Sequence, residues 1–285
     1  MKILVIGATG MVGHILFHEL QNKNINVVGI DRKKKLKDIL YFDLYTEIDT
    51  VIHFIKNENF DIIINCSAIL INESNINRKQ AVYINSFFPH LLVDLFKSTN
   101  TKIIHLSTGG VFTSDEKPYF EDSPISPPTY YGITKAAGEF NNEKDLIIRN
   151  DFWGPDANKD GTGLFNWFFN QQGMVTAYTN TFFNGISNIE FARILLELIS
   201  YNGILHIGAN ENISKCNFLE KIKSVFDLSN TTLLYNNNDF KNIFLKSNYK
   251  LPHINNYDIM IKDVYEYLIN NKQNYIDIYP QIDKN

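Results

Sequence analysis

Short apolar runs alternate with amphipathic segments through the first 150 residues. The runs predict strands at residues 2–6, 27–31, 39–42, 61–65, 102–106 and 146–148, and helical spacing predicts helices at 14–20, 48–55, 77–97 and around 131–135. Pro89 should kink the third of these helices. Continuous apolar strands are typical of sheets covered on both faces. The pattern therefore predicts an α/β fold, a Rossmann-type doubly wound parallel sheet that binds ligands at the carboxyl ends of its strands.

The alternation loosens after residue 150. Helices are expected at 188–199, 214–226 and 258–269, with a strand at 204–207. We predict a NAD(P)-binding Rossmann domain at 1–150 and a smaller substrate-binding region at 151–285, of which 181–207 should pack back on the first domain.

A glycine-rich turn follows the first predicted strand. Gly7 allows a sharp exit from the strand, Gly10 allows close approach of a pyrophosphate, and Gly13 allows the helix to pack near the sheet. The turn predicts dinucleotide binding at the helix N-terminus, with the intervening Thr9, Met11 and Val12 in the cradle.

Two further segments shape the predicted cofactor site. Asp31 ends the second strand, where a carboxylate accepts bonds from the adenosine ribose and repels a 2′-phosphate, so NAD(H) is favoured. The adjacent Arg32 keeps NADP(H) open, because a guanidinium can pair with that phosphate. Small residues after the fourth strand would let the cofactor pass: Cys66, Ser67 and Ala68. Asp43 either reaches the adenine amine or is a turn carboxylate.

Tyr131 and Lys135 are four residues apart, so a helix places them on one face. A neighbouring ammonium lowers the pKa of a phenol, which suits Tyr131 to protonate an alkoxide while nicotinamide delivers hydride. Thr108 ends the fifth strand and is expected to donate a hydrogen bond to the same substrate oxygen. These three residues are the predicted catalytic set, and Tyr131 and Lys135 are also expected to contact the cofactor, with Lys135 holding the nicotinamide ribose.

Composition narrows the class of ligand. A formal charge of −4 provides no basic field for nucleic acid or an anionic membrane, so a small molecule is expected. The two cysteines lack metal-ligand spacing, and no apolar stretch is long enough to span a bilayer, so we expect a cytoplasmic protein without a metal.

The motifs together resemble the extended short-chain dehydrogenase/reductase family, in particular its dTDP-4-dehydrorhamnose reductase branch. The resemblance runs through the glycine turn, Asp43-Leu44, Asn85, Ser107-Thr108, the loop at 118–124, the helix at 131–139 and Arg149. It implies NAD(P)H-dependent reduction of the 4-keto group of a nucleotide-activated 6-deoxyhexose, in deoxysugar biosynthesis. The assembly is left open, with a homodimer as one form.

The resemblance also implies roles for single residues. Asn85 and Leu44 join the cofactor set, and Asn85 supports the catalytic helix. Arg149 is expected to be a buried cation paired with a carboxylate. The residues implied at the sugar are Gly109, Val111, Trp153, Phe165 and Asn166, although a structural role for the aromatic ones is equally open.

Two departures from the branch bear on the substrate. Gly109 stands where an aspartate usually follows the catalytic threonine, and residues 71–75 replace an acidic stretch. With no proton-moving side chain near Thr108, we predict plain reduction without epimerisation. The alternatives are a nucleotide-sugar 4-epimerase that retains NAD and a non-catalytic NAD(P)-binding regulatory subunit.

Overall fold

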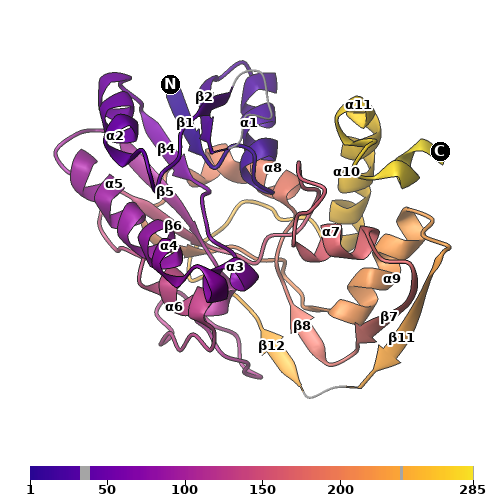
Figure 1. The fold of residues 1–285 in the computed structure, drawn as a ribbon. Coiled ribbons are helices and arrows are strands. Elements are labelled where there is room, and N and C mark those ends of the chain that lie inside the picture. Colours follow the sequence, from indigo (N-terminus) through magenta and orange to yellow (C-terminus); the bar gives the residue numbers. More distant parts are fainter. Residues whose placement is uncertain (33–38, 238–239, 285) are drawn as a thin grey trace.

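A seven-stranded parallel sheet forms the centre of the computed structural model, which describes residues 1–32, 39–237 and 240–284. The strand order is β3-β2-β1-β4-β5-β6-β9 (Figure 1). The strands are β1 (Lys2–Ile6), β2 (Asn26–Asp31), β3 (Ile39–Tyr41), β4 (Ile62–Asn65), β5 (Lys102–Ser107), β6 (Leu146–Arg149) and β9 (Gly203–His206). The chain moves outward from β1 in both directions, which confirms the predicted doubly wound sheet.

Helices cover both faces of the sheet, as continuous apolar strands require. Alternate residues of β1 enter different cores: Ile3 and Val5 join one, and Leu4 and Ile6 join the other. On the Ile3 side lie α1 (Gly13–Asn22) and α8 (Asn188–Leu198), and on the Leu4 side lie α2 (Ile48–Asn57) and α5 (Phe88–Phe96). β9 and α8 come from the later half of the chain but pack with the first, while a domain division near residue 150 stays a prediction.

The segment predicted as one kinked helix at 77–97 is three pieces. These are α4 (Arg78–Val82), a π-helical turn (Tyr83–Phe87) and α5. Pro89 lies in the first turn of α5. Because proline lacks an N–H and its ring crowds the carbonyl four residues earlier, the hydrogen-bond register widens just before it. The effect of Pro89 is thus seen as a change of hydrogen-bond register in the turn before it.

The helix predicted around residues 131–135 is α6 (Tyr130–Ala136), which carries the Tyr131 and Lys135 pair. Short elements on this side of the chain that were not predicted are α3 (Ile71–Ile76) and a 3₁₀ turn (Gly109–Val111). α6 contacts α3, α4 and the π-helical turn. The helix with Tyr131 and Lys135 is therefore held in part by the pieces of the broken helix.

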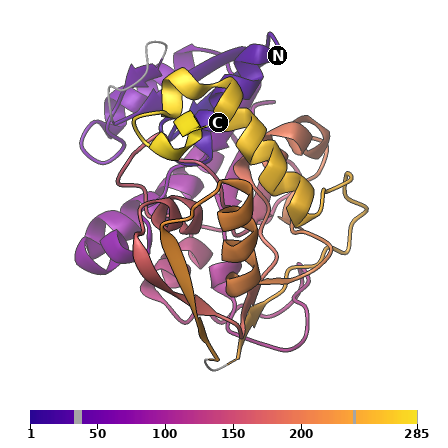
Figure 2. The same ribbon diagram turned by 90° about the vertical axis from the view of Figure 1, so that its right-hand side faces the viewer.

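The later part of the chain forms a second lobe beside the sheet (Figures 1 and 2). It contains α7 (Leu164–Phe169), β7 (Gly173–Tyr178), β8 (Thr181–Phe183), β10 (Ile213–Ser214), α9 (Lys215–Val225), β11 (Thr231–Asn236), β12 (Lys241–Ile243), α10 (Tyr257–Asn270), α11 (Lys272–Tyr275) and a 3₁₀ turn (Pro280–Lys284). β7 pairs with β11, and β8 lies between β10 and β12. Aromatic side chains fill its core, among them Phe165, Phe169, Phe226 and Tyr279.

Candidate active site

The glycine turn between β1 and α1 has the backbone geometry that the sequence predicts. Gly7 has φ of +78°, which favours glycine, and a Cβ there would lie 3.0 Å from the Ser67 backbone nitrogen. A Cβ on Gly13 would overlap the Gly7 carbonyl oxygen, whereas Gly10 meets only that same oxygen. The turn is therefore compact on its sheet side and free of side chains at Gly10. This geometry fits a dinucleotide pyrophosphate.

Asp31 is tied to this turn by a hydrogen bond from the backbone N–H of Thr9, 3.0 Å from its Oδ2. Its neighbour Arg32 is exposed. Asp43 instead caps its own turn: its Oδ1 accepts from the backbone N–H groups of Tyr45 (2.7 Å) and Thr46 (3.1 Å). Of the two interpretations of Asp43, the structure therefore favours the turn carboxylate, and Leu44 packs beside it against the apolar core.

The segment after β4 lies against the glycine turn and is fixed by amides. Asn65 Oδ1 accepts from the Ser67 N–H (3.1 Å) and hydroxyl (2.6 Å). The Asn85 side chain accepts from the Ile69 N–H (2.8 Å) and donates to the Ile69 carbonyl (2.9 Å). It also donates to the Thr134 hydroxyl of α6 at 3.0 Å. The half-buried Cys66, Ser67 and Ala68 line the edge beside the turn.

Asn85 corrects one expectation. Its side chain is fully buried, and its amide is engaged by Ile69 and Thr134, so it supports the site without facing a cofactor.

Lys135 lies almost completely buried beneath the site. Its Nζ donates to the Leu106 carbonyl (2.6 Å) and to Nε2 of His105 (3.0 Å). Burial lowers the pKa of Lys135 to about 8, opposed by the charges of Glu139 and Cys66. Burial and the ammonium hold the pKa of His105 well below its usual range, so this imidazole is a neutral acceptor. Sequence reasoning missed His105, although its place on β5 opposite α6 was available.

Tyr131 lies half-buried at the carboxyl edge of the sheet, and the expected effect of Lys135 on it is wrong. Burial, followed by the negative charge of Asp151, raises the pKa of the phenol well above its usual value, and the nearby Thr108 hydroxyl only partly opposes this. The Lys135 ammonium is turned toward Leu106 and His105 instead. In this state Tyr131 is a protonated phenol, which suits a proton donor.

Asp151 is the main functional candidate that sequence reasoning missed. Its Oδ1 accepts from the Thr108 hydroxyl and from the Gly109 N–H, each at 2.9 Å. A Cβ on Gly109 would lie 2.5 Å from Asp151 Oδ2, so the carboxylate fills the space in front of the glycine. The premise that no proton-moving group lies near Thr108 is therefore wrong. Neighbouring parallel strands were the available signal: Ser107 of β5 is paired with Arg149 of β6, which brings the residues after them together.

The residues implied at the sugar are mostly buried. Val111, Trp153, Phe165 and Asn166 have at most 1% of their surface exposed. Trp153 donates its indole N–H to the Gly185 carbonyl (2.9 Å), and Asn166 donates to the carbonyls of Lys159 and Gly161. Trp153, Phe165 and Asn166 therefore stabilise the second lobe, whereas Val111 packs with Phe112 and Leu245. Of the residues implied at the sugar, only Gly109 lies next to the Thr108 and Asp151 side chains, because its N–H donates to Asp151.

Arg149 is buried against Glu139, as expected. Its Nη2 donates to Glu139 Oε2 at 2.7 Å and its Nε donates to Oε1 at 3.0 Å, while the Ser107 hydroxyl donates to the same Oε1 at 2.5 Å. Arg149 also donates to Nε2 of His206 (3.1 Å). This network fixes the ends of β5, β6 and β9 behind the candidate site.

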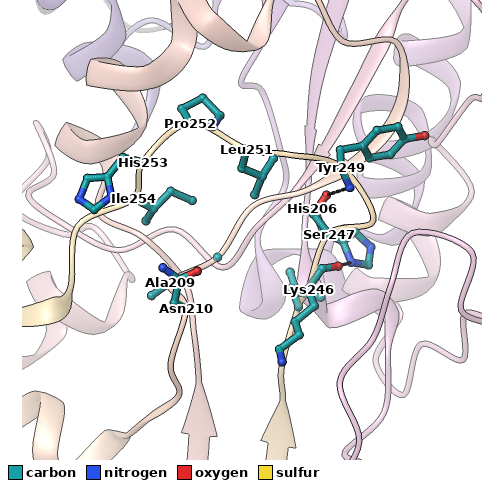
Figure 3. Close-up of a pocket in the computed structure, with 12 residues that line it drawn as sticks. His206, Ala209, Asn210, Lys246, Ser247, Tyr249, Leu251, Pro252, His253 and Ile254 are labelled. Atoms are coloured by element: carbon teal, nitrogen blue, oxygen red, sulfur yellow. Dashed lines mark hydrogen bonds between the residues drawn. The ribbon is translucent and has the colours of Figure 1, made fainter.

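A cavity of about 380 Å³ opens beyond His206, between residues 206–210 and the loop at 245–254 (Figure 3). It contains none of the predicted site residues. In the described part of the chain, no helix has the length and apolar character needed to cross a membrane.

The RmlD substrate binding domain family matches residues 1–150. The chain belongs to this family. A dTDP-4-dehydrorhamnose reductase from Mycolicibacterium smegmatis is 30% identical over 141 residues, which are 48% of this chain and 40% of that protein. The beta subunit of methionine adenosyltransferase 2 from Xenopus tropicalis is 25% identical over 252 residues, 81% of this chain and 74% of that protein. The matched segment spans less than half the length of the first curated relatives.

Solved structures share the fold over most of their length. A hypothetical dTDP-4-dehydrorhamnose reductase from Sulfolobus tokodaii has a TM-score of 0.72 and 26% identity, covering 84% of this chain and 86% of that one. A dTDP-4-dehydrorhamnose reductase from Bacillus anthracis, in complex with NADP, has a TM-score of 0.77 and 18% identity, covering 93% and 99%.

Proposed function

We propose that this protein reduces the 4-keto group of a nucleotide-activated 6-deoxyhexose with NADH or NADPH. The observation that carries the proposal is the half-buried Tyr131 phenol close to Thr108 and Asp151, on the same helix as the buried Lys135 ammonium. The relatives named dTDP-4-dehydrorhamnose reductase and dTDP-4-keto-6-deoxy-D-glucose reductase support this substrate class.

When bound, the cofactor supplies the hydride. Tyr131 gives the proton to the resulting alkoxide, since its phenol is protonated at neutral pH. Lys135, held in place by Leu106 and His105, supplies a buried positive charge one helical turn from Tyr131. Thr108 and Asp151, which are joined by a hydrogen bond, would lie on the other side of the substrate carbonyl from Tyr131.

The choice of cofactor rests on Asp31. Its carboxylate is fixed at the glycine turn and disfavours a 2′-phosphate, whereas the Bacillus anthracis relative was crystallised with NADP. We keep the preference for NADH as a prediction, with discrimination of less than about 100-fold because Arg32 offers a partner to that phosphate.

Two variants of α6 test the reaction. Purified protein should oxidise NADH or NADPH in the presence of dTDP-4-dehydrorhamnose or dTDP-4-keto-6-deoxyglucose, and Tyr131→Phe should lower kcat by roughly 10² to 10⁴. Tyr130→Phe is the matched control, because that hydroxyl only reaches the Arg78 carbonyl at 3.3 Å, and it should retain near wild-type kcat. Absence of turnover with both sugars and both cofactors would refute the proposal.

A non-catalytic regulatory subunit is the second candidate. The observation in its favour is that the sequence of the methionine adenosyltransferase subunit aligns over 81% of this chain, whereas that of the Mycolicibacterium smegmatis reductase aligns over 48%. Co-elution with the methionine adenosyltransferase of the same organism in fixed stoichiometry, together with no turnover of keto sugars, would favour it. Unchanged activity of Tyr131→Phe would point the same way.

A further inference from the structure

The Thr108 hydroxyl has only one proton, and the structure shows where it goes. Thr108 Oγ1 accepts from the Gly110 N–H at 3.0 Å and donates to Asp151 Oδ1 at 2.9 Å. A hydroxyl has one donor and two acceptor sites, so the site left for a substrate accepts a hydrogen bond. While Asp151 is a carboxylate, Thr108 therefore cannot donate to a substrate carbonyl.

One carboxylate oxygen of Asp151 receives no hydrogen bond from the described residues. Oδ1 receives the Thr108 hydroxyl and the Gly109 N–H, whereas no hydrogen bond ends on Oδ2 within residues 1–32, 39–237 and 240–284. Oδ2 lies in front of Gly109, in the space that a side chain there would occupy. The side chain is only half-buried, so Oδ2 is an acceptor at the reacting end.

The charge around this carboxylate favours a neutral donor. Lys215, at the start of α9, is a positive charge near Asp151. An ammonium group on a ligand would therefore be attracted by Asp151 but repelled by Lys215. A sugar hydroxyl donates without that conflict, and a hydrogen bond to a charged acceptor is stronger than one between neutral groups.

We propose that Asp151 is a specificity-determining residue that accepts a hydrogen bond from the substrate hydroxyl next to the reacting carbonyl. The hydroxyl is adjacent because Asp151 and Thr108 share a hydrogen bond and both lie near the Tyr131 phenol, which protonates the carbonyl oxygen. The preferred substrate is thus a 4-keto sugar that keeps its 3-hydroxyl. This inference rests on the proposed reduction.

The test compares dTDP-4-keto-6-deoxyglucose with its 3-deoxy analogue. The wild type should prefer the hydroxylated sugar in kcat/KM by about 10- to 100-fold, the size of a charge-assisted hydrogen bond. Asp151→Asn should remove most of that preference, chiefly by raising KM for the hydroxylated sugar. Asp94→Asn, which neutralises an exposed carboxylate on α5, is the matched control and should keep the wild-type preference.

A second variant guards against a folding defect. The Gly109→Asp/Asp151→Ala double variant moves the carboxylate from residue 151 to residue 109. The side chain at 109 then no longer clashes, because the Asp151 carboxyl has been removed. The double variant should recover part of the preference that Asp151→Ala loses, whereas Gly109→Asp alone should not be tolerated.

The possible failures are separable. If the wild type turns over neither sugar, the proposed function fails and this inference fails with it. If the wild type is active but Asp151→Asn leaves the preference intact, or lowers kcat/KM equally for both sugars, only the role of Asp151 is refuted.

Discussion

Replacing Glu139 by glutamine should destabilise the protein strongly. Glu139 and Arg149 are 6% and 3% exposed, and two hydrogen bonds of 2.7 and 3.0 Å join them. In Glu139→Gln an amide NH₂ would face the guanidinium, leaving a buried cation without its anion. Breaking a buried pair in this way costs about 3–5 kcal/mol. In a chain of this size that lowers Tm by about 10 °C.

Urea unfolding measures this cost directly. The control is Glu266→Gln, which breaks the exposed 3.7 Å contact with Lys262 and should change the free energy of unfolding by less than about 1 kcal/mol. A Glu139→Gln/Arg149→Met double variant should be no less stable than Glu139→Gln alone, because it also removes the unpaired cation. A loss below about 1 kcal/mol in Glu139→Gln would refute the assignment of this pair as the anchor of the β5 and β6 ends.

Three more predictions concern the cofactor half. The pKa of Lys135 lies near 8, so kcat/KM for the cofactor should fall as pH rises through about 8 and the ammonium loses its proton; a flat profile would contradict the role of this charge. Gly13→Ala should abolish cofactor binding in calorimetry and lower Tm, because the methyl overlaps the Gly7 carbonyl; wild-type affinity would disprove the close packing. Asp31→Ala should shift kcat/KM toward NADPH, and an unchanged ratio would show that Asp31 does not select the cofactor.

The Lys135 shift also sets a stability trend. Because the folded pKa of about 8 is below the ordinary lysine pKa of 10.5, the unfolded chain binds more protons between these two pH values. The contribution of Lys135 to the free energy of unfolding therefore rises as pH increases from about 8, and below that pH the buried charge is a cost.

The sheet could be predicted because each parallel strand has a local signature. β4, for example, is an unbroken run of isoleucines before Asn65, and such a run is buried on both faces wherever it lies in the order. The glycine turn was almost equally local, since Gly7 is required by its φ of +78° and the space at Gly10 and Gly13 is limited by the Gly7 carbonyl.

The candidate active site around Thr108 and Tyr131 could be predicted only in part, because its chemistry depends on contacts between residues of different strands and helices. Tyr131 and Lys135 share one helix, but the orientation of the Lys135 ammonium is set by His105 and Leu106, about 30 residues earlier. Asp151 is 43 residues from Thr108, and only the β5 and β6 register joins them. Of the two roles left open for Trp153 and Phe165, their burial favours the structural one, and the sequence could not decide between them because the exposure of a tryptophan cannot be read from its neighbours.

The far end of the chain holds the glycine turn from beneath. His14 Nδ1 donates to the Gly10 carbonyl at 2.8 Å, so its Nε2 accepts from the Tyr275 hydroxyl at 2.9 Å, across 261 residues. At about 5–20 residues per second, a ribosome needs on the order of 10–50 s to reach Tyr275 after His14. For that time the nascent chain lacks the hydroxyl that positions His14 against the glycine turn, so the turn gains its full support only when the last helices have been made.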